Sequence, residues 1–102
     1  MKHRRIQKVN SLLREVLSQV ILRDLPHRNI PELITITAVS ISKDLQFAKV
    51  YISLLGSDIN TKTATLANLQ KMSKYIAVIS SKKISLRYFP ELLFKLDDPM
   101  ES

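Results

Sequence analysis

The chain has 102 residues, a net charge of +7 and no cysteine. This length suits a single domain, and the lack of cysteine excludes disulfides and thiolate metal sites, as is typical of a reducing cytoplasm. No apolar run approaches the roughly 20 residues that a membrane span needs. Gly56 is the only glycine, which excludes the glycine-rich loops of nucleotide-binding enzymes.

Residues 4–24 are expected to form an amphipathic helix. Apolar residues recur at helical spacing, namely Ile6, Val9, Leu13, Val16, Leu17 and Val20. Arg4 and Lys8 fall on the opposite side and Arg5 flanks the stripe, so a basic surface remains for a partner. Pro26 is expected to end this helix.

Residues 33–42 and 47–55 are expected to form a β-hairpin. In the second strand the apolar residues alternate with others along Ala48, Val50, Ile52 and Leu54. This period of two predicts one buried face. Asp44 favours a turn between the strands, and a change of apolar phase near Thr37 and Ala38 indicates a β-bulge.

Two helices and a last strand are expected after Gly56. Asp58 is one of several candidate helix caps, and the two helices are expected to meet near Ser73. The last strand is predicted over residues 84–95, with Pro90 at an edge or a bulge. Strand alternation places Tyr88 with the core residues and Phe89 opposite, so Phe89 is the candidate for stacking on a base.

The order α-β-β-α-α-β predicts an α+β fold with a three-stranded mixed sheet and helices packed on one face. The hairpin is antiparallel, and a last strand that returns after a helical crossover can run parallel to a hairpin strand. We expect one domain over residues 1–98 and a short flexible tail over 99–102. This order matches a type II KH domain, an RNA-binding fold, although a single glycine excludes that fold's usual Gly-x-x-Gly clamp.

Positive charge is concentrated in two segments. Residues 1–28 hold seven basic and two acidic residues, and residues 62–87 hold six basic residues and no acidic one. Such segregation indicates a polyanionic partner, either RNA, DNA or an acidic membrane. The alternative is ordinary solubility charge on solvated helix faces.

Three segments resemble the bacterial ribosome-binding factor A family. SKDLQFAKVYISLLG is similar to that family's hairpin, whose pattern is roughly D-L-x-x-A-x-V-y-v-S. LRYFPELLFKLDD is similar to its L-R-x-x-P-E-L-x-F-x-x-D, and RRIQKVNSLLREVLSQVI to its first helix. The resemblance spans about residues 4–98.

The resemblance implies a type II KH-like fold and a cytoplasmic assembly factor that is not an enzyme. Family members associate with the free small ribosomal subunit (30S) and its 16S rRNA. They assist late maturation, including processing of the 16S rRNA 5′ end, and growth in the cold. The resemblance implies no cofactor, no membrane and no small-molecule substrate.

The family has an Ala-x-Gly kink between its last two helices, and Met72-Ser73-Lys74 stands at the matching positions. A lysine in a left-handed conformation would cost roughly 1 kcal/mol more than glycine. We therefore expect ordinary backbone dihedrals here, with Ser73 as the N-cap of the second helix.

The expected RNA-binding residues are basic side chains that neutralise phosphates, together with the serine between the two helices. They are Arg4, Arg5, Lys8, Lys71, Ser73, Lys74, Lys82, Lys83 and Arg87. No catalytic or metal-binding residue is predicted, and a monomer is expected. The alternatives are DNA binding, a module that binds an acidic protein, or a nuclease that uses Asp97 and Asp98.

Overall fold

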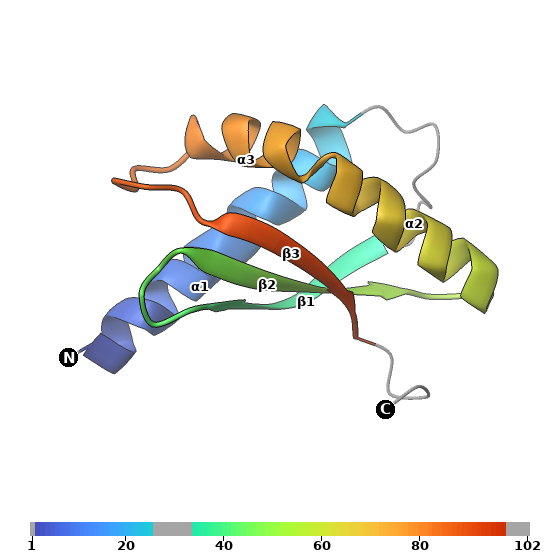
Figure 1. The fold of residues 1–102 in the computed structure, drawn as a ribbon, viewed down its shortest axis with the longest axis horizontal. Coiled ribbons are helices and arrows are strands. Elements are labelled where there is room, and N and C mark those ends of the chain that lie inside the picture. Colours follow the sequence, from blue (N-terminus) through green and yellow to red (C-terminus); the bar gives the residue numbers. More distant parts are fainter. Residues whose placement is uncertain (1, 26–33, 98–102) are drawn as a thin grey trace.

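Figure 1 shows the computed structural model of the chain, which describes residues 2–25 and 34–97, and side chains from residue 5 onward. Its elements in chain order are α1 (Lys2–Gln19), the π-helical turn η1 (Val20–Asp24), β1 (Ile34–Ile41), β2 (Phe47–Leu54), α2 (Ile59–Lys71), α3 (Ser73–Ser81) and β3 (Glu91–Leu96). The predicted α-β-β-α-α-β order is confirmed. Pro26 and the predicted tail 99–102 lie outside the described residues.

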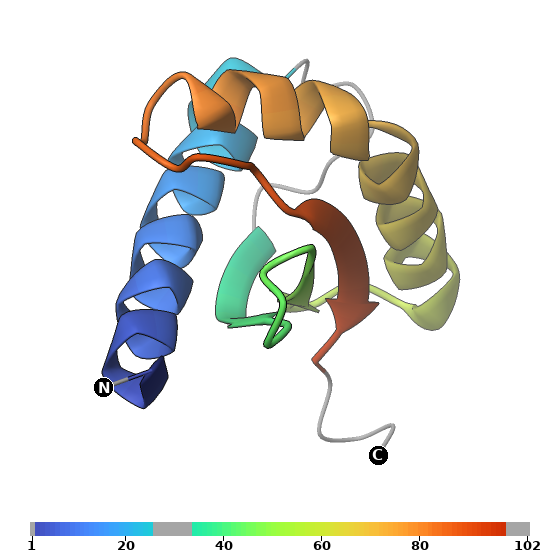
Figure 2. The same ribbon diagram turned by 60° about the vertical axis from the view of Figure 1, so that its left-hand side comes forward.

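The three strands form one mixed sheet in the order β1-β2-β3. β1 and β2 are antiparallel, and β3 runs parallel to β2, as predicted. All the described helices lie on one face of this sheet, and none of them covers the opposite face (Figure 1). Figure 2 shows α1 and α2 on the two sides, with α3 spanning between their upper ends. The type II KH-like architecture is therefore present.

The core lies between the sheet and the helices. Its members come from every element, including Leu13, Val16, Leu17 and Val20 of the first helix and Ala48, Val50, Ile52 and Leu54 of β2. These two predicted apolar patterns are confirmed. The first helix differs from prediction in its last turn, which widens into η1. Leu25 then adopts extended dihedrals, as expected for a residue before proline.

The hairpin has the predicted bulge and turn. The register of β1 against β2 shifts between Ile36 and Ala38, so that Thr37 is the extra residue. In the turn, the Asp44 carboxylate accepts hydrogen bonds from the Ser42 hydroxyl (2.6 Å) and the Gln46 N–H (3.2 Å). These bonds lower the pKa of Asp44 below its ordinary value, the Ser42 bond most.

Helix side chains satisfy backbone groups of the two outer strands. On β1, Asn10 accepts from the Ile41 N–H at 2.9 Å, and Arg14 donates to the Ile36 carbonyl at 3.3 Å. On β3, the Gln70 amide donates to the Leu92 carbonyl at 3.1 Å and accepts from the Phe94 N–H at 2.9 Å. Gln70 thus mimics a neighbouring strand and joins α2 to the sheet.

We expect Gln70→Ala to lower the free energy of unfolding by about 1–2 kcal/mol, because two hydrogen bonds to β3 are lost. Gln70→Glu should cost a similar amount, since a carboxylate cannot donate to the Leu92 carbonyl. Urea unfolding would measure both. Gln19→Ala, which removes an exposed glutamine from α1, is the control and should change stability little.

The predicted strand over 84–95 is wrong in its first half. β3 begins at Glu91, and residues 84–90 form an irregular loop. Pro90 has no N–H to donate, and it is buried directly before β3, which occupies an edge of the sheet. Pairing with β2 therefore starts only at Glu91, opposite Phe47.

The two predicted helices do meet near Ser73, but the predicted cap is wrong. Met72 is the boundary residue of both helices, with φ −90° and ψ 6°, and no side chain caps α3. The Met72 N–H donates to the Asn68 carbonyl at 3.1 Å, while its own carbonyl accepts from the Ile76 N–H at 2.8 Å. One residue thus ends α2 and begins α3, which leaves Ser73 inside the helix. The dihedrals here are ordinary, as expected.

One of the candidate caps predicted for the first of these helices is present. Asp58 accepts from the Thr61 N–H at 2.7 Å at the start of α2. This bond, followed by one with the Thr61 hydroxyl, lowers the pKa of Asp58. Of the several candidate caps, Asp58 is therefore the one that begins α2.

Candidate nucleic-acid interface

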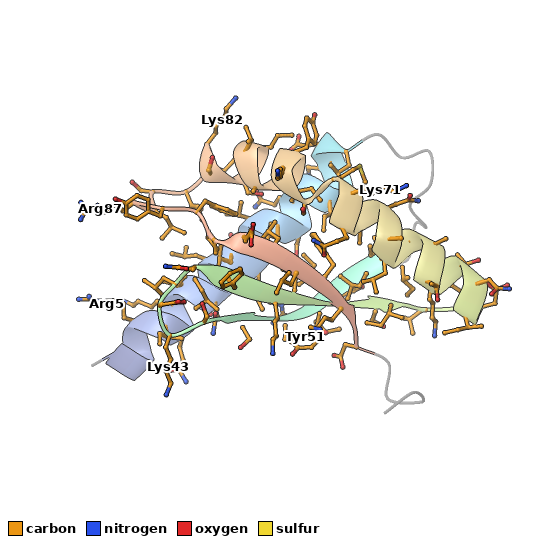
Figure 3. All side chains as sticks on the ribbon, viewed as in Figure 1. Arg5, Lys43, Tyr51, Lys71, Lys82 and Arg87 are labelled. Carbon is orange, nitrogen blue, oxygen red and sulfur yellow. The ribbon has the colours of Figure 1, made fainter. Side chains whose placement is uncertain are left out.

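Helix α3 presents a basic and aromatic outer face. Ile76 and Ser80 are fully buried and fix which side of α3 faces the core. Lys74, Tyr75 and Lys82 are consequently exposed, and Lys71 precedes them at the end of α2. Lys71 and Lys82 point outward from the helical layer in Figure 3. We refer to Lys71, Lys74 and Lys82 as the α3 group.

Residues 62–90, which include the α3 group, contain no acidic residue. No neighbouring carboxylate in this segment can therefore neutralise these lysines. Lys83 differs, since its ammonium lies 3.5 Å from the Asp24 carboxylate of η1. This ion pair connects the end of α3 to the end of the first helix. Lys83 thus forms an ion pair within the protein, whereas the exposed lysines of the α3 group are accessible to phosphates.

A second basic group lies at one end of the molecule. Figure 3 shows Arg5 of α1, Lys43 of the hairpin turn and Arg87 of the 84–90 loop at the left-hand end, with Lys71 towards the other side. We refer to Arg5, Lys43 and Arg87 as the end group. Of the predicted basic residues, Arg5 and Arg87 therefore belong to the end group, and Lys71, Lys74 and Lys82 belong to the α3 group.

The remaining predicted site residues have different surroundings. Lys8 is exposed on α1, where it lines a shallow hollow of about 490 Å³ with Leu12 and Glu15. Ser73 is half-buried in the first turn of α3 and makes no capping bond. The side chain of Arg4 lies outside the described ones.

The predicted roles of the two neighbouring aromatic residues are reversed. Tyr88 is 75% exposed, whereas Phe89 is partly buried against the core. Strand alternation does not apply to either residue, because both precede β3 in the irregular loop. Phe89 is therefore a packing residue, and Tyr88 is the ring that a ligand can reach.

Sequence reasoning missed three candidate residues, namely Lys43, Tyr75 and Tyr88. Tyr75 could have been found, because helical spacing places it beside Val78 and on a different side of α3 from the apolar Ile76. Lys43 could not, because only the folded chain brings the hairpin turn to the same end as Arg5 and Arg87.

Asp97 has a structural role in the described residues. Its carboxylate accepts a 2.6 Å hydrogen bond from the hydroxyl of Thr37, the extra residue of the bulge. Within the described ranges, no three His, Cys, Asp or Glu side chains lie close enough together to hold a metal ion. None of the described helices is long and apolar enough to cross a membrane.

Comparison with known proteins matches residues 5–102 to the family model described as Ribosome-binding factor A. The chain belongs to the ribosome-binding factor A family. A ribosome-binding factor A from Protochlamydia amoebophila is 48% identical over 97 residues, which cover 95% of this chain and 73% of that protein. One from Chlamydia abortus is 49% identical over 98 residues, covering 95% and 81% of the two chains.

Solved structures of the ribosome-binding factor A family share the fold. The crystal structure from Thermus thermophilus superposes with a TM-score of 0.75 at 21% identity, covering 89% of this chain and 94% of that one. The solution structure of a putative ribosome-binding factor A from Thermotoga maritima superposes with a TM-score of 0.63 at 27% identity. The superposition covers 95% of this chain and 87% of that one. Family membership predicted from the strand motifs is thus confirmed by sequence and by architecture.

Proposed function

We propose that this chain is a non-catalytic factor of ribosome assembly that binds the free small ribosomal subunit through 16S rRNA. In this role it assists late maturation, including processing of the 16S rRNA 5′ end. The observation that carries the proposal is the 48% identity to a ribosome-binding factor A over 95% of the chain. A homology model of the Thermus thermophilus ribosome-binding factor A, which has this fold, has been fitted into a cryo-EM map of a 30S–RbfA complex.

The basic surface supports RNA as the contacted component. The exposed α3 group extends from the end of α2 to the residue after α3, and the end group lies on three separate elements. Lysine and arginine side chains neutralise phosphates and release condensed counterions. Binding without a Gly-x-x-Gly clamp would then depend mainly on charge and rRNA shape, with little reading of base sequence.

Sedimentation through a gradient of ribosomal particles tests the proposed function. Tagged protein should be enriched on free small subunits and absent from assembled ribosomes. If about six phosphates are neutralised, log affinity should fall against log salt with a slope of roughly −4 to −5. A slope near zero, or binding that survives complete nuclease digestion, would indicate a protein partner instead.

The processing role needs a separate measurement in cells. Depletion of the protein should raise the fraction of 16S rRNA that retains an unprocessed 5′ end, most strongly in the cold. An unchanged 5′ end on depletion would contradict the processing role without affecting subunit binding.

A further inference from the structure

Arg87 and Tyr88 form an exposed pair in the 84–90 loop. The Arg87 guanidinium carbon lies 5.5 Å from the centroid of the Tyr88 ring, which is within the range of a cation–π contact. Tyr88 remains 75% exposed even with Arg87 beside it. It is the most exposed large apolar side chain among the described residues. Packing of the core does not explain a ring in this position.

The loop holds the pair in place. Leu86 on one side and Phe89 on the other are partly buried against the core, and Pro90 is buried. The Glu91 N–H then donates to the Gln46 carbonyl at 2.8 Å, which fixes the end of the loop to the hairpin turn. Arg87 and Tyr88 therefore project from a loop whose flanking residues are anchored, so little order is lost when a ligand binds them.

The surroundings favour a negatively charged ligand with a flat ring. Arg87 belongs to the end group together with Arg5 and Lys43, and the segment before Tyr88 contains Lys82 and Lys83 but no acidic residue. Bases of single-stranded nucleic acids stack on exposed aromatic rings while nearby basic side chains hold the backbone. A paired base cannot do this, because both of its faces are covered within the duplex.

We infer that Arg87 and Tyr88 form a stacking platform for one unpaired RNA base, next to the phosphates held by the end group. This inference rests on the proposed function and adds a site to it. The platform would let the protein distinguish an unpaired rRNA segment from a paired one, which charge alone cannot do.

A tryptophan reporter tests the platform directly. The chain contains no tryptophan, so Tyr88→Trp introduces the only one. Titration with a short single-stranded oligoadenylate should quench its fluorescence, and a fully paired RNA duplex of equal length should leave it unchanged. Tyr51→Trp, on the sheet face without helices, is the control and should respond to neither RNA. Absence of quenching at position 88, or equal quenching at both positions, would overturn the inference.

Affinity for small subunits gives a second test that separates stacking from charge. Tyr88→Ala should weaken binding roughly 5- to 100-fold without changing the salt slope, while Tyr88→Phe keeps wild-type affinity. Arg87→Ala should weaken binding and also make the slope shallower by about 1. Wild-type affinity in Tyr88→Ala would overturn the platform and leave the proposed function standing. Failure of the unmodified protein to co-sediment would instead contradict the proposed function.

Discussion

Replacement of Lys71, Lys74 and Lys82 by alanine is expected to weaken binding to free small subunits by roughly 10- to 100-fold at moderate salt. Lys71 is the last residue of α2, Lys74 lies in the first turn of α3 and Lys82 directly follows α3, and each exposed ammonium group can neutralise one phosphate. Their loss should also make the salt slope shallower by about 2 to 3. Filter binding or sedimentation over a range of salt concentrations would measure both quantities.

A matched variant separates the position of these charges from their number. Alanine at Lys49, Lys62 and Lys95 removes the same charge from other parts of the surface. Lys49 is exposed on β2, and Lys95 is exposed on β3. This control should keep most of the affinity. Equal weakening in both variants would show that net charge, rather than the α3 group, determines binding. Circular dichroism should show that both variants remain folded, because these side chains lie outside the core.

Ile76→Ala is expected to lower the free energy of unfolding by about 2–5 kcal/mol. The Ile76 side chain is 0% exposed in the hydrophobic core. Removal of three carbon atoms loses transfer free energy and leaves a cavity that surrounding residues fill only in part. Since small domains are stable by only about 5–15 kcal/mol, this variant should show a large shift in its urea unfolding midpoint.

Val78→Ala is the matched control on the same helix. Val78 is 54% exposed, so its truncation should change stability by less than about 0.5 kcal/mol. The same contrast should appear in binding, because α3 positions Lys74 and Tyr75. A variant at Ile76 that unfolds at the same urea concentration as Val78→Ala would show that α3 is not docked on the core.

Much of the fold follows from periodicity that can be read in the sequence. Alternation from Ala48 to Leu54 predicts a half-buried strand, because the side chains of a strand point to opposite faces in turn. The phase change near Thr37 predicts the bulge for the same reason, and Asp58 is a candidate cap for α2 because its carboxylate can satisfy a free N–H. These are local relations between neighbouring residues, so no tertiary information is needed.

The predictions were wrong where a rule for regular strands or helices was applied to a loop or to the boundary between two helices. The apolar residues Ile84 and Leu86 continue the pattern of β3, yet they pack against the core from an irregular loop. The alternation of apolar residues therefore led to the prediction of a strand that begins too early. In that predicted strand Tyr88 faces the core and Phe89 faces solvent, which is the reverse of what the structure shows. At Met72 the two helices share one boundary residue, an arrangement that depends on how α2 and α3 pack and that helix-cap preferences do not predict.

The family, the order of the elements, most of the core and the basic character of the surface can all be read from the chain without its fold. These properties depend on composition, local spacing and motif. Which basic residues lie at the same end of the molecule depends on the folded chain, because Arg5, Lys43 and Arg87 are far apart in sequence and belong to different elements. The pairing of Lys83 with Asp24 also depends on the fold, since it joins distant segments, and Tyr88 is exposed because β3 begins only at Glu91.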